Sequence, residues 1–466
     1  MTYGDYGDSL HLTRKGTDMS RELTRRGFIA AATATATAAG AGLSFGGSSS
    51  AAEKPALLGG KRVRTKPFPS WPKMDKLEDE SILKVLRSGH WFRGDSQQVT
   101  RFEQAYAKLT GAKHCVATAN GTAALVASMG ALGIGPGDEV IVPPYTFVAT
   151  VTSVLMHYAL PVFVDSDPDT FQIDPRKIEA AITERTAALL PVHIGGSVAD
   201  LDAILAIAAK HKLPVIEDAC QAHLAEWKGR KVGTWGTTGC FSFQVTKNLC
   251  SGEGGAILTA DLDLAQKCYA FHNNCRARQI TGYNFTYLGA RSQNLRMTEF
   301  QGALLLAQMT RVEEQSRTRE ENAKYLTNML KEIPGIQPAK MYEGCTRNAY
   351  HLYMLRYKPE QFANLPRAKF LQALGAEGIP CSSGYSPLNK EAFIQGTLST
   401  RGYERIYSKE RLAQWEDRNQ CPENDKLCQE GVWLSQTMLL GPRSDMDQIA
   451  EAIRKIRAHA GELAKA

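Results

Sequence analysis

A single lysine stands where a short apolar strand is expected to run into a glycine-rich loop. Lys247 follows the apolar stretch 240–243 and precedes Gly-Glu-Gly-Gly at 252–255, and no other lysine or arginine occurs between residues 240 and 258. A lysine held among aromatic and small residues is partly desolvated, which lowers the pKa of its amine and leaves a neutral fraction that can attack an aldehyde. The alternative is a solvated lysine in the loop after an edge strand, which would carry no chemistry.

The residues around Lys247 resemble the pyridoxal phosphate (PLP) site of the DegT/StrS-type sugar aminotransferases. In that family a strand Phe-Ser-Phe precedes the lysine that holds the cofactor aldehyde, and Gly-Glu-Gly-Gly follows it; in this chain the strand contains Ser242. The resemblance implies that Lys247 holds PLP through a Schiff base and then acts as general acid and base in a 1,3-proton shift.

A PLP enzyme also needs a carboxylate that keeps the pyridine nitrogen protonated, and Asp218 is the candidate. It ends the apolar run Pro214–Asp218, and ligands of mostly parallel sheets bind at the carboxyl ends of the strands. Glu217 would point to the opposite face of the strand. The structural alternative is that Asp218 only caps the following turn. The resemblance implies that Gln221 bonds the ring hydroxyl, while His223 either orients that loop or is structural.

A site for the cofactor phosphate is expected where the sequence Asn-Gly-Thr at 120–122 follows a strand and opens a helix. Backbone N–H groups and the helix dipole face an incoming anion there, Gly121 lets the backbone approach closely, and the Thr122 hydroxyl adds a donor. Together with Ser242 this run matches the phosphate cup of the family. Phe147 is the candidate for stacking on the cofactor ring, and its alternative is a core phenylalanine.

The run 289–301 resembles the family motif Asn-x-Arg-Met-Thr-[Asp/Glu], which begins here at Asn294. In the family this asparagine reaches the cofactor phosphate of the neighbouring subunit, so the resemblance implies a homodimer with shared active sites. Taken alone, Asn294 and Arg296 would be a helix cap and a surface charge. Arg296, His351 and Tyr353 are the candidates for substrate contacts.

Strand-like and helix-like segments alternate from about residue 112 to residue 260. The expected strands are 114–118, 139–142, 161–165, 187–193, 214–218, 240–243 and 256–259. Apolar residues at helical spacing lie between the earlier strands, at 121–132, 147–158, 175–183 and 201–211. This alternation predicts an α/β fold with a mostly parallel sheet covered on both faces, and the resemblance implies the fold of the fold-type-I PLP-dependent transferases.

The pattern becomes mainly helical after residue 296. Helices are expected at 297–313, 320–330, 368–374 and 446–460, and a strand at 350–357. We predict a large PLP-binding domain over 53–310, with an N-terminal arm, and a smaller α+β domain over 311–466. The polar region 389–424 has little periodicity and predicts an irregular insertion or active-site flank.

Residues 1–52 differ in kind from the rest of the chain. Arg25 and Arg26 are followed by an uncharged Ala/Thr/Gly stretch to about Ser50, which is typical of a twin-arginine export signal. The alternative is a flexible Ala/Thr-rich tail, and the stretch has too little apolar surface for a stable membrane anchor. We expect an exported, periplasmic protein, or a cytoplasmic one if the signal is not used.

Composition excludes several other classes of protein. The 466 residues carry a formal net charge of +7 without a run of basic residues interleaved with aromatic ones, so nucleic acid is not an expected partner. The ten cysteines form no Cys-x-x-Cys pair and no cluster with metal-ligand spacing, so no metal is expected. Cys421 and Cys428 could be oxidised after export, although the sequence does not pair them.

A finer resemblance concerns the substrate. Four C-terminal segments resemble the branch of the family that acts on cyclitol ketones, including scyllo-inosose aminotransferases, and its aminohydroxybenzoate synthase relatives; they are 348–356, 378–388, 421–425 and 432–434. The resemblance implies a PLP-dependent aminotransferase that moves an amino group from glutamate or glutamine to a keto-sugar or ketocyclitol. The alternatives are a dehydratase or aromatising PLP enzyme on the same scaffold and a non-catalytic sugar-binding or regulatory homologue.

Overall fold

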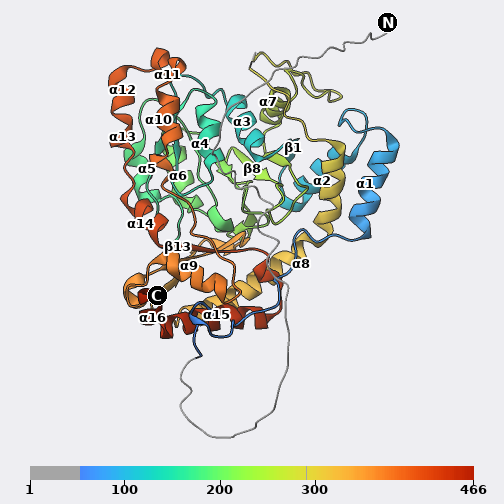
Figure 1. The fold of residues 1–466 in the computed structure, drawn as a ribbon. Helices are drawn as coiled ribbons and strands as arrows, with labels where there is room; N and C mark the ends of the chain where they lie inside the picture. Colours follow the sequence, from blue (N-terminus) through green and yellow to red (C-terminus); the bar gives the residue numbers. More distant parts are fainter. Residues whose placement is uncertain (1–52, 290) are drawn as a thin grey trace, which may run out of the picture. The chain divides into compact units, whose positions relative to one another are not determined.

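The computed structural model describes residues 53–289 and 291–466 (Figure 1). The residues after Ala51 form one compact unit built around a sheet of seven strands. Isolated parallel bridges, Leu189 to Val215 and Val192 to Asp218, join its two halves. The spatial order is β1 (His114–Thr118), β9 (Gly255–Thr259), β8 (Thr238–Ser242), β5 (Ile216–Asp218), β4 (Thr186–Leu189), β2 (Glu139–Val142) and β3 (Leu160–Phe163). Only β9 runs antiparallel to its neighbours in this sheet, so the predicted fold class is confirmed.

Both faces of this sheet are buried, because side chains that alternate along each strand enter different cores. Along β1, Val116 belongs to a core shared with α3 (Gly121–Ala131), α4 (Val148–Leu155) and α7 (Leu262–His272). Its neighbours Cys115 and Ala117 belong to a core shared with α2 (Gln98–Thr110) and α8 (Glu299–Leu330). The other helices of this region are α1 (Lys76–Ser88), α5 (Pro175–Ala181) and α6 (Leu201–His211).

Three expected helices differ from the structure at places that matter for the site. The helix expected at 147–158 begins only at Val148, because Phe147 has an extended backbone with φ −70° and ψ 142°. The two helices expected between 297 and 330 are one continuous helix, α8, which opens with a capping box between Thr298 and Gln301. No glycine or proline interrupts residues 314–319, and Arg319 is buried against other elements rather than exposed in a loop.

A second, antiparallel sheet lies toward the C-terminus, beside a core of its own. Its strands, in spatial order, are β10 (Ile336–Pro338), β12 (Leu352–Tyr357) and β13 (Gly431–Ser435). The core below it is shared by the second half of α8, α9 (Arg367–Ala376), α15 (Arg443–Ala458) and α16 (Ala460–Lys465). Helix α8 contacts α1 and α2 with one half and α15 with the other (Figure 1). It therefore continues without a break across residue 310, where the boundary between the two domains is predicted. The division into domains at that residue stays a prediction.

The expectation of an irregular region at 389–424 is wrong. Short helices fill it: α10 (Ala392–Leu398), α11 (Arg401–Ile406), α12 (Lys409–Ala413), α13 (Trp415–Arg418) and the start of α14 (Pro422–Glu430). Tyr403 is buried with its hydroxyl donating to the carbonyls of Leu155 and Ala159, and the Trp415 indole donates to Pro161 at 2.8 Å. These anchors onto the large sheet region are spaced too unevenly for a sequence period to reveal them.

The remaining strands form a small sheet in which β6 (Glu226–Trp227) lies between β7 (Arg230–Lys231) and β11 (Cys345–Arg347). Cys421 and Cys428 are buried free thiols. Within residues 53–289 and 291–466, every helix is too short or too polar to cross a lipid bilayer. The twin-arginine segment lies outside the described residues.

Candidate active site

A cavity of about 680 Å³ opens at the carboxyl ends of β5 and β8. Most of the side chains that the sequence marked as candidates line it. They are Gly121, Thr122, Phe147, Asp218, Gln221, Ser242, Lys247 and His351. Asn294, Arg296 and Tyr353 do not line it. Residues from far-apart parts of the chain therefore meet in one hollow of the size that proteins use for small molecules, roughly 300–1,000 Å³.

Lys247 is presented to this cavity by a tightly hydrogen-bonded loop after β8. The backbone N–H of Lys247 donates to Gln244 at 2.8 Å, and that of Val245 donates to Gly252 at 2.9 Å. Gly252 has φ +86°, a backbone conformation that residues other than glycine rarely adopt. Burial lowers the pKa of the Lys247 amine, and the nearby Cys220 and Asp218 oppose that shift. The loop thus holds an amine with an increased neutral fraction inside the cavity.

Asp218 is a buried carboxylate at the end of β5. Its Oδ2 accepts a hydrogen bond from the Thr150 hydroxyl at 2.8 Å, and its Oδ1 accepts one from the backbone N–H of Cys220 at 3.2 Å. Among the described residues, no lysine, arginine or histidine forms an ion pair with it. A buried carboxylate without a cationic partner fits a cationic ligand such as a protonated pyridine nitrogen.

Glu217, the preceding residue, points to the other face of β5. Its carboxylate accepts hydrogen bonds from the backbone N–H groups of Gly233, Trp235 and Gly236 at 2.7–2.8 Å, and it lies 3.0 Å from Nε2 of His193. Burial tends to raise the pKa of Glu217, but the bonds from His193 and the backbone outweigh it and lower the pKa. Glu217 therefore has a full set of structural partners.

The N-terminus of α3 and the end of β8 form the part of the cavity that suits an anion. Asn120 caps the helix, since its Oδ1 accepts from the N–H of Ala123 at 2.8 Å. A Cβ added to Gly121 would lie 2.6 Å from Cβ of Ser242, so only glycine allows this close approach. The first N–H groups of a helix lack intrahelical partners and face outward. The hydroxyls of Thr122 and Ser242 complete a set of neutral donors suited to phosphate.

Phe147 lies on the rim of the cavity and is 54% exposed, so the alternative of a core phenylalanine is wrong. It lies directly before α4 and is not part of the core that α4 enters. The stacking role stays a prediction.

The opposite wall is aromatic, and the sequence patterns did not single it out. Tyr385 and Trp433 line the cavity and pack edge to face, with ring centroids 4.5 Å apart. Gln221 is fixed between the two walls, because its Oε1 accepts from the N–H of Gly195 at 2.8 Å and its Nε2 donates to the Tyr385 hydroxyl at 3.1 Å. Both aromatic residues lie in segments that resemble the cyclitol branch, which was the one signal available for them.

Asn294 and Arg296 lie on a loop outside the cavity. Asn294 is exposed, and Arg296 donates to the Asn273 side chain at 3.1 Å with its guanidinium over the Phe92 ring. Tyr353 is buried elsewhere, with its hydroxyl 2.8 Å from that of Thr327.

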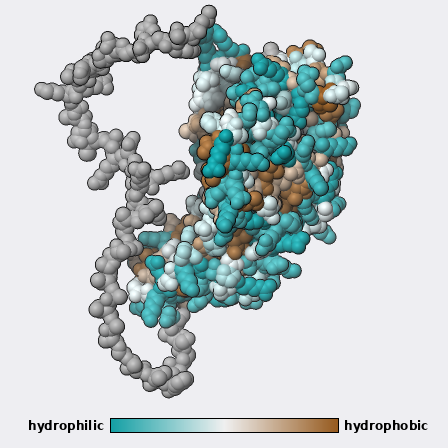
Figure 2. All heavy atoms as spheres, turned by 90° about the vertical axis from the view of Figure 1, so that its right-hand side faces the viewer, coloured by the Kyte–Doolittle hydropathy of each residue, from teal (hydrophilic) through white to brown (hydrophobic). Residues whose placement is uncertain are grey.

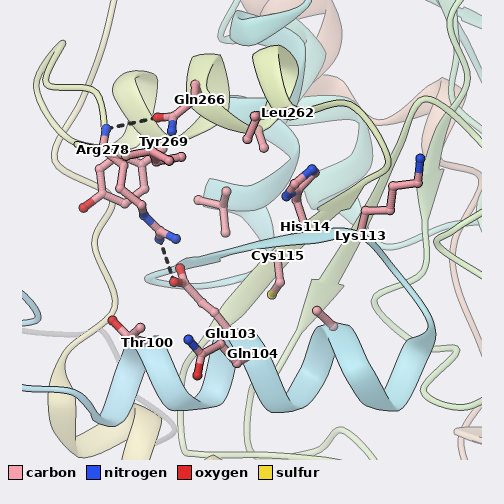
Figure 3. A pocket seen from close by; sticks show the side chains of 14 residues that line it. Thr100, Glu103, Gln104, Lys113, His114, Cys115, Leu262, Gln266, Tyr269 and Arg278 are labelled. Atoms are coloured by element: carbon pink, nitrogen blue, oxygen red, sulfur yellow. Dashed lines mark hydrogen bonds and ion pairs between the residues drawn. The ribbon is translucent and has the colours of Figure 1, made fainter. Parts of the chain in front are cut away.

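A second, smaller pocket of about 160 Å³ lies where this loop is attached to the rest of the protein. Figure 3 shows Arg278 of the loop reaching Glu103 of α2, a contact of 2.6 Å, while its backbone N–H donates to Gln266 of α7. The Arg278 guanidinium also lies over the Tyr269 ring. None of the candidate residues lines this pocket, and its Glu103, Gln266 and Arg278 bind one another, so we assign it a structural role.

The model of the DegT/DnrJ/EryC1/StrS aminotransferase family matches residues 72–454. The chain is 37% identical over 434 residues to the L-glutamine:2-deoxy-scyllo-inosose aminotransferase of Streptoalloteichus tenebrarius, covering 88% of this chain and 98% of that protein. It is 36% identical over 422 residues to the L-glutamine:scyllo-inosose aminotransferase of Streptomyces griseus, covering 88% and 99%. Among solved structures, 3-amino-5-hydroxybenzoic acid synthase matches with a TM-score of 0.72 and 30% identity, covering 86% of this chain and all of that one.

Proposed function

The chain belongs to the DegT/DnrJ/EryC1/StrS aminotransferase family, and on that basis we propose that it transfers the amino group of L-glutamine or glutamate to a ketocyclitol, with PLP held at Lys247. One observation carries the proposal. The amine of Lys247, the buried carboxylate of Asp218 and the donors around Gly121 converge on a single cavity of about 680 Å³.

The residues present fit PLP. Asp218 forms no ion pair within the described chain and would hold the protonated pyridine nitrogen, and the neutral donors of Thr122 and Ser242 would hold the phosphate beside the N-terminus of α3. When bound, PLP supplies the aldehyde that carries the amino group and the ring that withdraws electrons from the reacting carbon. Lys247 would hold the aldehyde and afterwards move a proton at the same place.

The wall of the cavity favours an uncharged acceptor. Of the described residues that line it, Lys247 is the one lysine or arginine, whereas a nucleotide-linked sugar brings a diphosphate that basic side chains usually neutralise. Tyr385 and Trp433 offer aromatic faces and edges to the C–H surface of a ring, and Gln221 offers polar atoms for its hydroxyls. Relatives named for scyllo-inosose and 2-deoxy-scyllo-inosose support the same class.

The test is a panel of acceptors offered with L-glutamine to the PLP-loaded protein. We expect amination of scyllo-inosose or 2-deoxy-scyllo-inosose, detected as the amino product by mass spectrometry, with at least tenfold lower kcat/KM for a nucleotide-linked keto-sugar, about 1.4 kcal/mol in transition-state binding. L-glutamate in place of L-glutamine identifies the donor.

Matched reactions without donor show whether the acceptor is dehydrated or aromatised instead. Amination of the nucleotide-linked sugar alone would contradict the cyclitol assignment. Formation of a dehydrated or aromatic product that carries no amine would contradict the proposal that the protein is an aminotransferase.

We also propose a homodimer whose subunits share active sites. Asn294 is exposed and outside the cavity of its own chain, as expected for a residue that serves a neighbouring one. Large apolar side chains are exposed around α1, namely Met74, Leu83, Leu86, Trp91 and Phe92. Figure 2 shows brown areas among polar ones on the face that carries this helix. Burial of such a patch between copies would contribute to a stable interface.

Export through the twin-arginine route remains a proposal that rests on Arg25, Arg26 and the uncharged stretch after them. In a bacterial host with this pathway, we expect the full chain to accumulate in the periplasm. Changing both arginines to lysine should retain it in the cytoplasm, as measured by immunoblotting of the two fractions. Equal distribution of the two forms would contradict export by this route.

A further inference from the structure

A row of two polar side chains, His351 and Asn248, connects Lys247 to the backbone of the segment before β12. The Lys247 amine lies 3.4 Å from Nε2 of His351, Nδ1 of His351 lies 3.3 Å from Oδ1 of Asn248, and Nδ2 of Asn248 lies 2.7 Å from the carbonyl oxygen of Ala349. His351 and Asn248 are both buried. The row therefore lies beside the reactive amine and is largely shielded from water.

The row determines which nitrogen of His351 carries the proton. The Ala349 carbonyl can only accept, so the Asn248 amide must turn its NH₂ group toward it and its oxygen toward His351. That oxygen also only accepts, so the facing Nδ1 of His351 must be the donor. In a neutral imidazole the other nitrogen, Nε2, then has a free lone pair, and it is Nε2 that faces Lys247.

The surroundings keep this imidazole neutral. Burial, and then the cationic Lys247, hold the pKa of His351 well below its ordinary value; His223 and Arg319 act in the same direction. Besides His351, the titratable groups that interact with Lys247 from other elements are Asp218 at the end of β5, and Cys220 and His223 in the segment that follows it. An approach of 3.4 Å is long for a hydrogen bond, and such contacts commonly tighten when the site is loaded.

We propose that His351 is a positioning residue for Lys247, whose amine donates a hydrogen bond to the unprotonated Nε2 and is thereby held with its lone pair in one direction. No covalent bond changes in this step. An acceptor next to an ammonium group favours the charged form, so His351 opposes part of the desolvation that lowers the Lys247 pKa. The value of such a contact to catalysis rests on the proposed function, whereas the contact itself does not.

The experiment measures the titration of Lys247 in the full chain without cofactor. Trace acetic anhydride is applied over a series of pH values, and acetylation of the peptide that contains residue 247 is quantified by mass spectrometry. His351→Leu removes the acceptor and should lower the titration midpoint of Lys247 by about one pH unit, as expected for loss of a hydrogen bond to a charged group. His351→Gln keeps an acceptor, so its midpoint should stay close to that of the wild-type protein.

Two further variants separate positioning from packing. Asn248→Leu frees the His351 tautomer and should lower the midpoint by less than His351→Leu does. Met354→Leu changes a buried side chain on β12 that does not line the cavity, and it should leave the midpoint unchanged. Thermal melting of each variant verifies that it is folded.

An unchanged or raised midpoint in His351→Leu would overturn the inference, as would an equal shift in Met354→Leu. Failure of the proposed function looks different. In that case the midpoint of Lys247 shifts in the variants as predicted, but borohydride treatment traps no PLP on it.

Discussion

Replacing Lys247 by alanine should abolish covalent retention of PLP and lower turnover by at least about 10⁴-fold, because one side chain supplies both the attachment and the proton transfer. The cavity contains no substitute, since Lys247 is the one lysine among the described residues that line it. The measurements are borohydride reduction followed by peptide mass spectrometry, and amino-product formation with L-glutamine and the best acceptor. A variant that still traps PLP on the chain would contradict the assignment of Lys247.

The same variant tests the shared active site. Lys247→Ala and Asn294→Ala each damage a different part of every site in their own dimers. If the sites are shared as proposed, one site of a mixed dimer regains both residues, with Lys247 from one subunit and Asn294 from the other. Denaturing and refolding an equal mixture should restore about a quarter of wild-type activity if pairing is random. Activity no higher than the mean of the two separate variants would contradict sharing through Asn294.

The sequence was informative wherever burial produces a simple local pattern of apolar residues. Strands of the large sheet are covered on both faces, so they appear as short continuous apolar runs, and the run 114–118 coincides with β1. The strand period of two also separates Asp218 from Glu217, and the structure places these side chains on opposite faces of β5. Lys247 and the residues around Gly121 could be found because glycine and short polar residues at strand ends are local signals.

The sequence was less informative where the site depends on contacts between distant segments. The bond from Gln221 to Tyr385 joins residues 164 positions apart, and that between Lys247 and His351 joins residues 104 apart. No local pattern encodes such pairs. His351 was expected to contact substrate, and its packing behind Lys247 became visible only once the C-terminal segment was placed against the β8 loop. The short helices of 389–424 were missed for the same reason, because single anchors such as Trp415 hold them.

Asp218→Asn should lower turnover by about 10²–10³-fold while PLP remains attached at Lys247. The amide has the shape of the carboxylate, and its one oxygen can keep accepting from the Cys220 N–H. The NH₂ group then faces the Thr150 hydroxyl, which can accept from it and turn its own proton toward Thr146. It lacks the negative charge that would hold a proton on the pyridine nitrogen, and the ring then withdraws electrons less strongly. The measurement pairs steady-state turnover with borohydride trapping, so that loss of rate is separated from loss of cofactor.

Glu217→Gln is the matched control for that prediction, since it makes the same chemical change one residue earlier on β5. Glu217 accepts three backbone N–H bonds and contacts His193 on the far side of the sheet. A neutral amide there should lower the free energy of unfolding by about 1–3 kcal/mol and leave the turnover of the folded protein near wild type. Equal losses of turnover in the two variants would mean that general damage to β5, and not the charge at Asp218, accounts for the effect.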